Sequence, residues 1–541
     1  MRDHPSPAFA SYDQWYATFR WRIPERYNMA IHACDSWAAR DPQRPALLVK
    51  GPDGFMPISY GTLAARSNAL ARALATRGIG RADRVGILAP QSPEILISHF
   101  ALYKLGAVAV PLAAVFGSEA ITYRLSDSDA KGLISDAAGL AKLDPDPARL
   151  PGLALRVCLD GSAPGIEGFD RLIAGENADP LPVNTGPDDP ALMIYTSGTT
   201  GQPKGALHAH RVLIPHVTGQ VFTHDGLPRR DDRMWTPSDW AWAGGLLNTV
   251  LPALAHGVPV VVQPSGRFDP EAAFALLAQA QVRNVFIPPT ALKMMRTVAR
   301  ARERYGFSLR TVGSAGEALG AQAAAWGREA LGVPVNEFYG QTECNYVIGS
   351  SAALGVARAG ATGKAVPGHD VAVLSEDGNP APVGEMGQIA VRTPNPALFL
   401  GYWNRSQATA EKFLGDWMLT GDLARRDEAG YIHFLGRNDD VITSAGYRIG
   451  PSEIEDCLLR HPAVALAAVV GKPDPVRTEI IKAFIVLHPG VTPGPTLVSD
   501  LQNLVRETLA GYEYPREIAF VDELPLTTTG KVIRRQLRDQ A

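Results

Sequence analysis

Short β-rich runs alternate with helical segments over much of this 541-residue chain. Arg84–Leu88 predicts a strand, and Pro93–Leu105 predicts a helix because its large apolar side chains recur at three- and four-residue steps. Gly106 follows as a helix C-cap, and Ala107–Leu112 predicts the next strand. A strand, a helix and a second strand in succession favour a parallel, doubly wound α/β sheet with helices on both faces.

The same cycle recurs at Val258–Val262, Pro270–Ala280 and Val285–Ile287, where Asp269 is the expected helix N-cap. After about residue 370 the pattern changes to short strands separated by turns, which indicates a β-rich subdomain at about 370–437. We therefore expect a large N-terminal domain, 1–437, and a small α/β domain, 438–541.

Composition excludes several classes of protein. An apolar fraction of 46% is too high for a disordered chain, and a net charge of −3 gives no basic face for nucleic acid. No apolar run reaches the roughly 18 residues of a membrane span, and no secretory signal opens the sequence. The four cysteines share no metal-ligand spacing. We expect a soluble, cytoplasmic protein without a membrane span.

The segment IYTSGTTGQPKG, Ile194–Gly205, follows an apolar run and is therefore expected to leave a strand. Its glycines permit tight turns with free N–H groups, and its hydroxyls and one lysine suit a polyphosphate. It lacks the Gly-Lys-Ser/Thr of a P-loop, and a flexible surface loop is the alternative interpretation. The candidate phosphate-binding residues are Thr196, Ser197, Gly198, Thr199, Thr200, Gly201 and Lys204.

This segment resembles the signature of the AMP-forming acyl-CoA synthetase superfamily, the adenylate-forming enzymes that also include luciferases and peptide-synthetase adenylation domains. Further motifs in matching order extend the resemblance over most of the chain. GYRIGPSEIE at 446–455 and PDPVR at 473–477 are most similar to the medium-chain acyl-CoA synthetases. The resemblance implies ATP, Mg²⁺ and coenzyme A as cofactors and co-substrates.

The second motif, YGQTE at 339–343, groups an aromatic ring, a hydroxyl and a carboxylate. These groups suit a nucleotide base, a phosphate and Mg²⁺, and the resemblance implies those roles for Tyr339, Thr342 and Glu343. It also implies that the adenine is cradled near Gly316 and Glu317 and that the ribose is held by Asp422 and Arg437. Ordinary surface turns are the alternative for each. Within YGQTE, Gly340 and Gln341 complete the expected nucleotide set.

The C-terminal domain is expected to move. Lys531 matches the lysine that serves adenylation in the family, in a Gly-flanked loop where a compact ammonium suits a developing negative charge. Asp439 matches the hinge about which this domain swings between two catalytic arrangements, and a solvated acid is its alternative. The residues matching coenzyme A contacts of medium-chain relatives are Ala445, Gly446, Tyr447, Arg477, Tyr514 and Arg516, and Arg448 matches a residue that interacts near the phosphates. The cationic residues among these are equally compatible with surface charges. Ala445 replaces the serine of close relatives.

Three residues are expected to shape the acyl pocket. Trp242 matches a pocket tryptophan, whereas Trp240 stands where relatives have a small residue. The alternative is that both are core-packing aromatics, and this interpretation is favoured for Trp240. Acetate-specific relatives carry tryptophan at the position of Gly340, so a glycine there is expected to leave space beyond a methyl group.

The expected reaction is ATP-dependent, AMP-forming ligation of a short- to medium-chain or branched carboxylic acid to coenzyme A, with Lys531, Thr342 and Glu343 as the catalytic residues. The alternatives are an aryl-CoA or acetate-CoA ligase, an enzyme that loads a carrier protein, a luciferase-type relative, and a nucleotide-binding regulator without catalysis. A homo-oligomer and a lysine acyltransferase acting on Lys531 are left open as partners.

Overall fold

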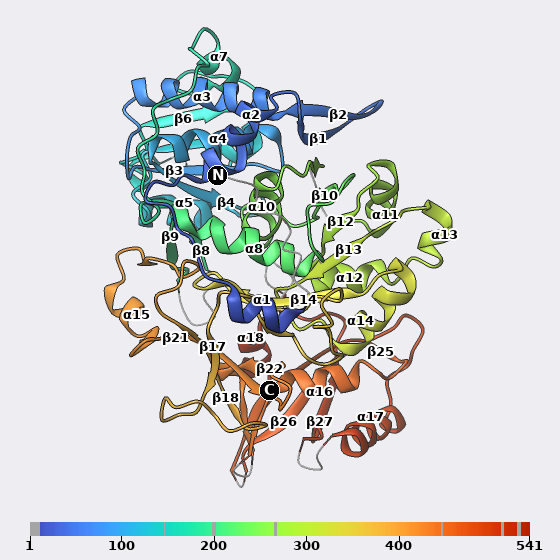
Figure 1. Cartoon of the computed structure of the whole chain (residues 1–541). Coiled ribbons are helices and arrows are strands. Elements are labelled where there is room, and N and C mark those ends of the chain that lie inside the picture. The colour runs from blue at the N-terminus through green and yellow to red at the C-terminus, as the bar shows by residue number, and fades with distance from the viewer. Residues whose placement is uncertain are drawn as a thin grey trace.

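A computed structural model describes residues 11–541 except 145, 197–201, 264–267, 445–446, 476, 510–512 and 527–531. Two large sheets lie in the N-terminal part of the chain, with a smaller β sheet and a C-terminal α/β unit below them in Figure 1. This arrangement confirms the expected mixed α/β fold with a large N-terminal and a small C-terminal domain.

The first large sheet is built around parallel strands, as the alternating pattern predicted. Its β3 and β4 pair in parallel with β5 and β8 beside them, and only its β19–β9–β8 edge is antiparallel. Its order is β19 (Gly401–Tyr402), β9 (Gly205–Ala209), β8 (Pro190–Tyr195), β4 (Val108–Leu112), β3 (Arg84–Leu88), β5 (Gly132–Ser135), β6 (Leu155–Cys158) and β7 (Glu167–Gly168).

The second large sheet has a parallel centre and antiparallel edges. Its order is β16 (Lys364–Ala365), β15 (Asn345–Gly349), β14 (Val335–Gln341), β13 (Thr311–Ser314), β12 (Asn284–Phe286), β10 (Met234–Trp235), β11 (Val260–Val262), β1 (Pro45–Gly51) and β2 (Gly54–Ser59). The predicted second cycle is confirmed here with shifted ends, because β11 begins at Val260 and β12 at Asn284.

The helices begin and end where local chemistry directs them. Helix α4 spans Pro93–Leu105, and Gly106 caps it at φ +67° in the left-handed region. Asp269 caps α11 by accepting hydrogen bonds from two backbone N–H groups of the first turn. Besides α4, the α-helices are α1 (Tyr12–Thr18), α2 (Ser36–Arg40), α3 (Tyr60–Thr76), α5 (Ser118–Asp127), α6 (Ala137–Leu140), α7 (Phe169–Ile173), α8 (Leu213–Thr223), α9 (Ala243–Gly245), α10 (Leu251–Ala255), α11 (Pro270–Gln279), α12 (Pro289–Met295), α13 (Ala301–Tyr305), α14 (Ala321–Trp326), α15 (Ser406–Ala410), α16 (Pro451–Leu458), α17 (Pro495–Thr508) and α18 (Arg534–Asp539).

Two smaller antiparallel sheets follow. The β-rich region predicted after residue 370 contains β17 (Val371–Leu374), β18 (Met386–Arg392), β21 (Trp417–Arg426), β20 (Phe413–Leu414) and β22 (Ile432–Arg437). The C-terminal sheet, to which β27 alone adds in parallel, contains β24 (Tyr447–Ile449), β23 (Ile442–Ser444), β26 (Thr478–Leu487), β25 (Val464–Asp474) and β27 (Glu517–Phe520).

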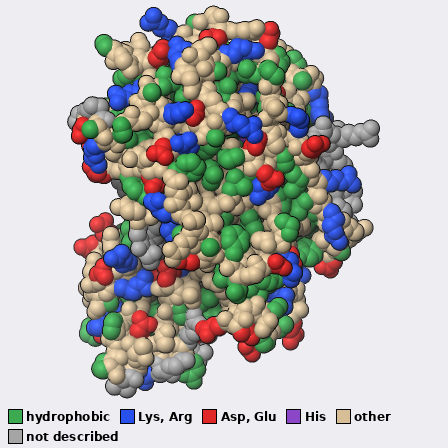
Figure 2. Space-filling view, turned by 90° about the vertical axis from the view of Figure 1, so that its left-hand side faces the viewer, with side chains coloured by type: hydrophobic (Ala, Val, Ile, Leu, Met, Phe, Trp, Pro, Cys, Tyr) green, Lys and Arg blue, Asp and Glu red, His purple; other side chains and the backbone are tan. Residues whose placement is uncertain are grey.

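Charged side chains of both signs are mixed over the face shown in Figure 2. Within the described ranges, no helix is both long and apolar enough to cross a bilayer.

Candidate active site

The predicted phosphate loop closes the β8–β9 hairpin. Strand β8 is buried from Ala191 to Tyr195, and the Thr196 N–H donates to the Lys204 carbonyl at 2.9 Å where the hairpin continues. The expectation that the loop leaves a buried strand is therefore confirmed. Ser197, Gly198, Thr199, Thr200 and Gly201 lie outside the described residues.

Lys204 and Glu343 meet at one aromatic residue. The Lys204 ammonium lies 5.0 Å from the centre of the Tyr402 ring, and the Tyr402 hydroxyl donates to Glu343 Oε1. Burial and the adjacent carboxylate both raise the pKa of Tyr402, which keeps the hydroxyl protonated as a donor. Tyr402 reaches this place because β19 pairs with β9, the strand that follows the phosphate loop.

Strand order brings the two segments predicted to hold adenine to one edge of the second large sheet. Strands β13 and β14 run parallel, so the segment after β13 and the end of β14 lie at the same carboxyl edge of the sheet. Gly316 follows β13 at φ +103°, a conformation that residues with side chains rarely adopt. The Thr290 hydroxyl donates to Glu317 at 2.6 Å and fixes that side chain. Tyr339 ends on this edge as well.

Asp422 is the acceptor at the centre of a buried polar network. The Tyr339 hydroxyl donates to its carboxylate at 2.5 Å and the Gln341 amide at 3.0 Å. Lys412 donates to Gln341 Oε1 at 3.1 Å, and Asp422 itself is only 8% exposed. Burial, and then the Asp422 carboxylate, raise the pKa of Tyr339, so its hydroxyl remains a donor. A carboxylate held in this way is suited to accept hydrogen bonds from a diol.

Thr342 and Glu343 lie in the turn between β14 and β15. The Glu343 carbonyl accepts a hydrogen bond from the Phe399 N–H at 2.9 Å, and Glu343 is 8% exposed. Arg437 pairs across the β21–β22 ladder with Asp422, and its Nε donates to Asp439 Oδ1 at 2.8 Å. The structure therefore joins Tyr339, Gln341, Asp422 and Arg437, and separately joins Lys204 with Glu343.

The predicted coenzyme A residues gather around the start of β26. Tyr447 is half exposed at the end of the β23–β24 hairpin, whose Ser444 pairs with Thr478 of β26. The Arg477 N–H donates to Asp474 at 2.8 Å. The Arg516 guanidinium lies 5.1 Å from the Tyr514 ring, and the Arg516 N–H donates to Ile481 of β26. Arg448 lies within β24, while Ala445, Gly446 and Lys531 lie outside the described residues.

Main chain lies close beside Gly340. A β carbon added there would lie 1.3 Å from the backbone oxygen of Asn345, and the β14–β15 ladder shifts register between Tyr339 and Gly340. The expectation that Gly340 leaves space in the acyl pocket stays a prediction.

The two tryptophans have different surroundings. Trp240 is 2% exposed and belongs to the central core cluster. Trp242 is only partly buried and packs edge-on against Phe116, with ring centres 5.8 Å apart.

Sequence reasoning missed Tyr402 and Lys412. Tyr402 occupies a two-residue strand without periodicity, and only the β19–β9 pairing places it beside Lys204.

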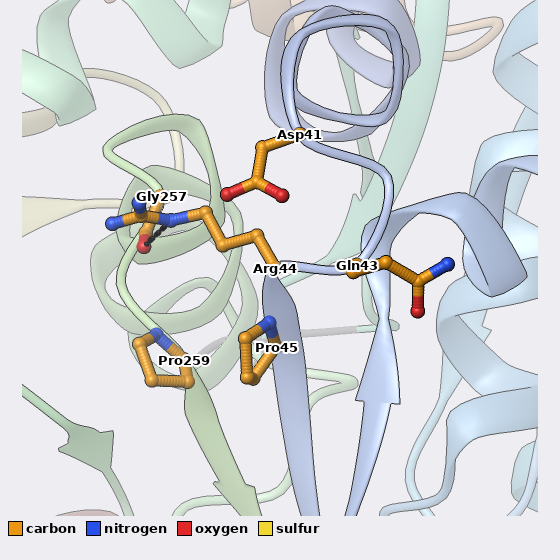
Figure 3. A pocket seen from close by; sticks show the side chains of 6 residues that line it. All are labelled: Asp41, Gln43, Arg44, Pro45, Gly257 and Pro259. Atoms are coloured by element: carbon orange, nitrogen blue, oxygen red, sulfur yellow. Dashed lines mark hydrogen bonds between the residues drawn. The ribbon is translucent and has the colours of Figure 1, made fainter.

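A shallow hollow of about 340 Å³ lies away from these residues, at the start of β1. In Figure 3, Arg44 crosses this hollow and its Nε donates to the Gly257 carbonyl, and none of the lining residues belongs to the predicted site.

Comparison with known proteins finds matching family models and similar proteins. The model of the AMP-binding enzyme family matches residues 34–403, and that of the AMP-binding enzyme C-terminal domain matches 453–531. The mitochondrial acyl-coenzyme A synthetase ACSM5 of Homo sapiens is 34% identical, over 96% of this chain and 91% of that protein. The acetyl-coenzyme A synthetase of Bacillus subtilis (strain 168) is 32% identical, over 98% and 94%. The anthranilate CoA ligase AuaEII in complex with anthranoyl-AMP superposes with a TM-score of 0.88 at 29% identity, covering 96% and 98% of the two chains.

The contact at Gly340 predicts the outcome of a small substitution. Gly340→Ala forces the β14–β15 turn to move, and overpacking of this kind costs about 1–3 kcal/mol. We expect a lower melting temperature in thermal denaturation. Gly80→Ala is the control, because a β carbon there meets no atom within 4 Å. A Gly340→Ala variant that melts with the unmodified protein contradicts the close approach.

Proposed function

The chain belongs to the AMP-binding enzyme family of AMP-forming CoA ligases, and from that premise we propose that it joins a short- to medium-chain carboxylic acid to coenzyme A. The convergence of Lys204 and Glu343 on Tyr402 is the observation that carries this proposal. One side chain thus contacts both the cation of the phosphate loop, through its ring, and the carboxylate of the YGQTE motif, through its hydroxyl, and a polyphosphate with its counter-ion requires both kinds of charge.

The reaction has two steps. A carboxylate oxygen of the acid attacks the α-phosphorus of ATP, the bond to the bridging oxygen breaks, and pyrophosphate leaves. The thiol sulfur of coenzyme A then attacks the acyl carbonyl, loses its proton, and displaces AMP. Because no protein nucleophile is required, catalysis rests on positioning and electrostatic stabilisation.

Different side chains contact the adenosine and the phosphate ends of ATP in this proposal. Tyr339 and Asp422 hold the adenosine end, with Asp422 accepting from the ribose hydroxyls in place of the Tyr339 and Gln341 donors that it binds here. Lys204 and Thr342 contact the phosphates. Lys531 meets the charge that develops during the first step.

Adenylate-forming CoA ligases use Mg²⁺, and the residues present suit it. Magnesium is usually held by one or two carboxylates together with substrate phosphates rather than by an all-protein cage. Glu343 supplies such a carboxylate, and no group of three or more His, Cys, Asp or Glu residues able to hold a metal occurs in the described part of the chain. The bound ion neutralises charge on the phosphates.

An aryl-CoA ligase is the second candidate. The edge-on pair of Trp242 and Phe116 offers an aromatic wall of the kind that planar acids pack against. The anthranilate ligase with a TM-score of 0.88 supports the same alternative.

A panel of acids separates these candidates. Each buried methylene contributes about 0.8 kcal/mol, so acids of four to six carbons should exceed acetate by about 10–100-fold in kcat/KM. The measurement is coenzyme A-dependent AMP release with acetate, butyrate, hexanoate, a branched acid, benzoate and anthranilate. Preference for acetate contradicts the chain-length proposal, and preference for benzoate or anthranilate selects the aryl alternative. AMP release that does not depend on coenzyme A contradicts the ligase proposal itself.

Lys531→Ala tests the assignment of the first step. Loss of a charge-assisted contact to the transition state should slow acyl-adenylate formation by about 10²–10³-fold. Thioester formation from acyl-adenylate supplied ready-made should be largely retained. Acyl-hydroxamate formation measures the first step, and Lys50→Ala, an exposed position, is the control. Equal losses in both steps contradict the assignment.

Tyr402→Phe tests the arrangement around Glu343. The ring beside Lys204 is kept, but the hydrogen bond that orients the carboxylate is lost, and losses of this kind weaken metal affinity or activity by about 10–100-fold. We expect a higher Mg²⁺ concentration for half-maximal adenylation. Tyr305→Phe removes a similar hydroxyl bond to Glu271 at a remote site and serves as the control. An unchanged Mg²⁺ dependence argues against Tyr402 as the orienting group.

A further inference from the structure

A cleft of about 450 Å³ opens between the N-terminal and C-terminal parts of the chain. One wall comes from α12 and the start of α14, and the other from α16, the turn that leads into β25, and the end of β26. Figure 1 shows α14 above α16. The volume is of the size that small-molecule sites have. The lining residues with which we are concerned are Lys293, Arg296, Gly320, Asp456, Arg460 and His461.

The two walls touch where Asp456 meets Gly320. A β carbon added to Gly320 would lie 2.8 Å from Asp456 Oδ1, so the carboxylate packs directly against this backbone. Gly320 also has a φ of +74°, a conformation that residues with side chains rarely adopt. Because both residues line the cleft, a ligand bound there contacts both parts of the chain.

Positive side chains outnumber negative ones in the lining. Lys293, Arg296 and Arg460 line the cleft, and Asp456 is the one acidic residue beside them, which leaves a net charge of about +2 with neutral histidines. Within the described residues, the side chains of Lys293 and Arg460 form no hydrogen bond and no close ion pair. Arg296 makes only long contacts of 3.4 Å, to Gln322 Oε1. These cations are therefore available to a ligand.

The other acidic side chains of α16 are paired away from the cleft. Glu453 forms an ion pair with Arg425 at 2.9 Å, and Glu455 forms one with Arg534 at 2.8 Å. Neither glutamate is among the residues that line the cleft. Their charges are balanced by arginines elsewhere, so they do little to neutralise the cations of the lining.

Burial raises the pKa of two carboxyl groups beside the cleft. The pKa of Asp456 rises to about 6, although Lys293 and Arg460 act against this shift. Glu337, whose Oε1 accepts from the Leu319 N–H at 3.4 Å, has its pKa raised to about 7, with burial as the largest cause. Both groups take up a proton more readily than surface carboxylates, which reduces their opposition to a bound anion.

Apolar side chains and an imidazole complete the lining. Leu319, Ala323 and Val464 are buried side chains that line the cleft. His461 Nδ1 accepts from the Ala463 N–H at 3.2 Å, so the neutral ring carries its proton on Nε2 and is a donor there. The cleft thus offers both apolar surface and donors to an organic anion.

We propose that this cleft binds a phosphate monoester with a small apolar or aromatic group, which Lys293 and Arg460 hold from opposite walls. A phosphate monoester carries about −1.5 to −2 charges at pH 7, which matches the charge of the lining. Charge-assisted hydrogen bonds fix its oxygens, and its organic group packs on the apolar side chains. The proposal does not depend on the proposed function, because none of the lining residues belongs to the predicted ATP, coenzyme A or acyl sets.

Phenyl phosphate is the probe, and isothermal titration calorimetry of the full chain measures its affinity. We expect one saturable site with a Kd of about 1 mM or tighter. Lys293→Gln and Arg460→Gln should each weaken binding by about 10-fold, because each removes a charge-assisted hydrogen bond. Benzenesulfonate has the same ring but a single negative charge, and it should bind at least about 10-fold more weakly.

Asp456→Asn should change the affinity in the opposite direction. It removes the negative charge nearest the cations, so phenyl phosphate should bind about 3–10-fold more tightly, a gain that damage to the fold does not produce. Arg300→Gln removes an exposed cation outside the lining and is the matched control, with unchanged affinity. Lys204→Gln, in the predicted phosphate loop, should also leave the affinity for phenyl phosphate unchanged.

Several results overturn the inference. They are the absence of saturable binding, unchanged affinity in both Lys293→Gln and Arg460→Gln, or weaker binding by Asp456→Asn. Loss of binding in Lys204→Gln places the probe at the nucleotide phosphates and overturns it as well, and equal affinity for benzenesulfonate overturns the assignment to a phosphate monoester. A protein that binds phenyl phosphate as expected but forms no acyl-hydroxamate with any acid of the panel refutes the proposed function alone.

Discussion

The hydrogen bond from Tyr339 to Asp422 joins two sheets, which also share an apolar cluster that includes Ile348 and Ile389. Tyr339 lies within β14 of a large sheet, whereas Asp422 lies within β21 of the β-rich sheet. A carboxylate that is 8% exposed is costly to bury without donors, and two side chains of the YGQTE motif supply them. The same bond therefore stabilises the junction between the sheets and keeps in place the carboxylate that we propose binds the nucleotide ribose.

Much of this arrangement could be predicted from the sequence. Periodicity and capping chemistry predicted both ends of the Pro93–Leu105 helix correctly, because Gly106 and the strand that follows it end the helix there. The ends of strands were predicted less accurately. The strand that begins at Val260 was expected from Val258, because the limits of a strand depend on partner strands that are distant in sequence.

The contacts of the site were harder to foresee. Tyr402 reaches Glu343 only through pairing of a two-residue strand with β9, and no local pattern marks such a strand. At Gly340, the sequence indicates an absent side chain but not that the Asn345 main chain lies beside it. For Trp240, the choice between core and pocket depended on packing from helices far along the chain.

A β carbon at position 340 would meet the Asn345 main chain, which restricts how the sequence of this turn can diverge. Any single change at this position must also re-route the main chain of the turn that carries Thr342 and Glu343. Variation here is therefore coupled to the conformation of two other residues of the same motif. Trp242 and Phe116 meet through their ring side chains, so this pair can vary in small, independent steps.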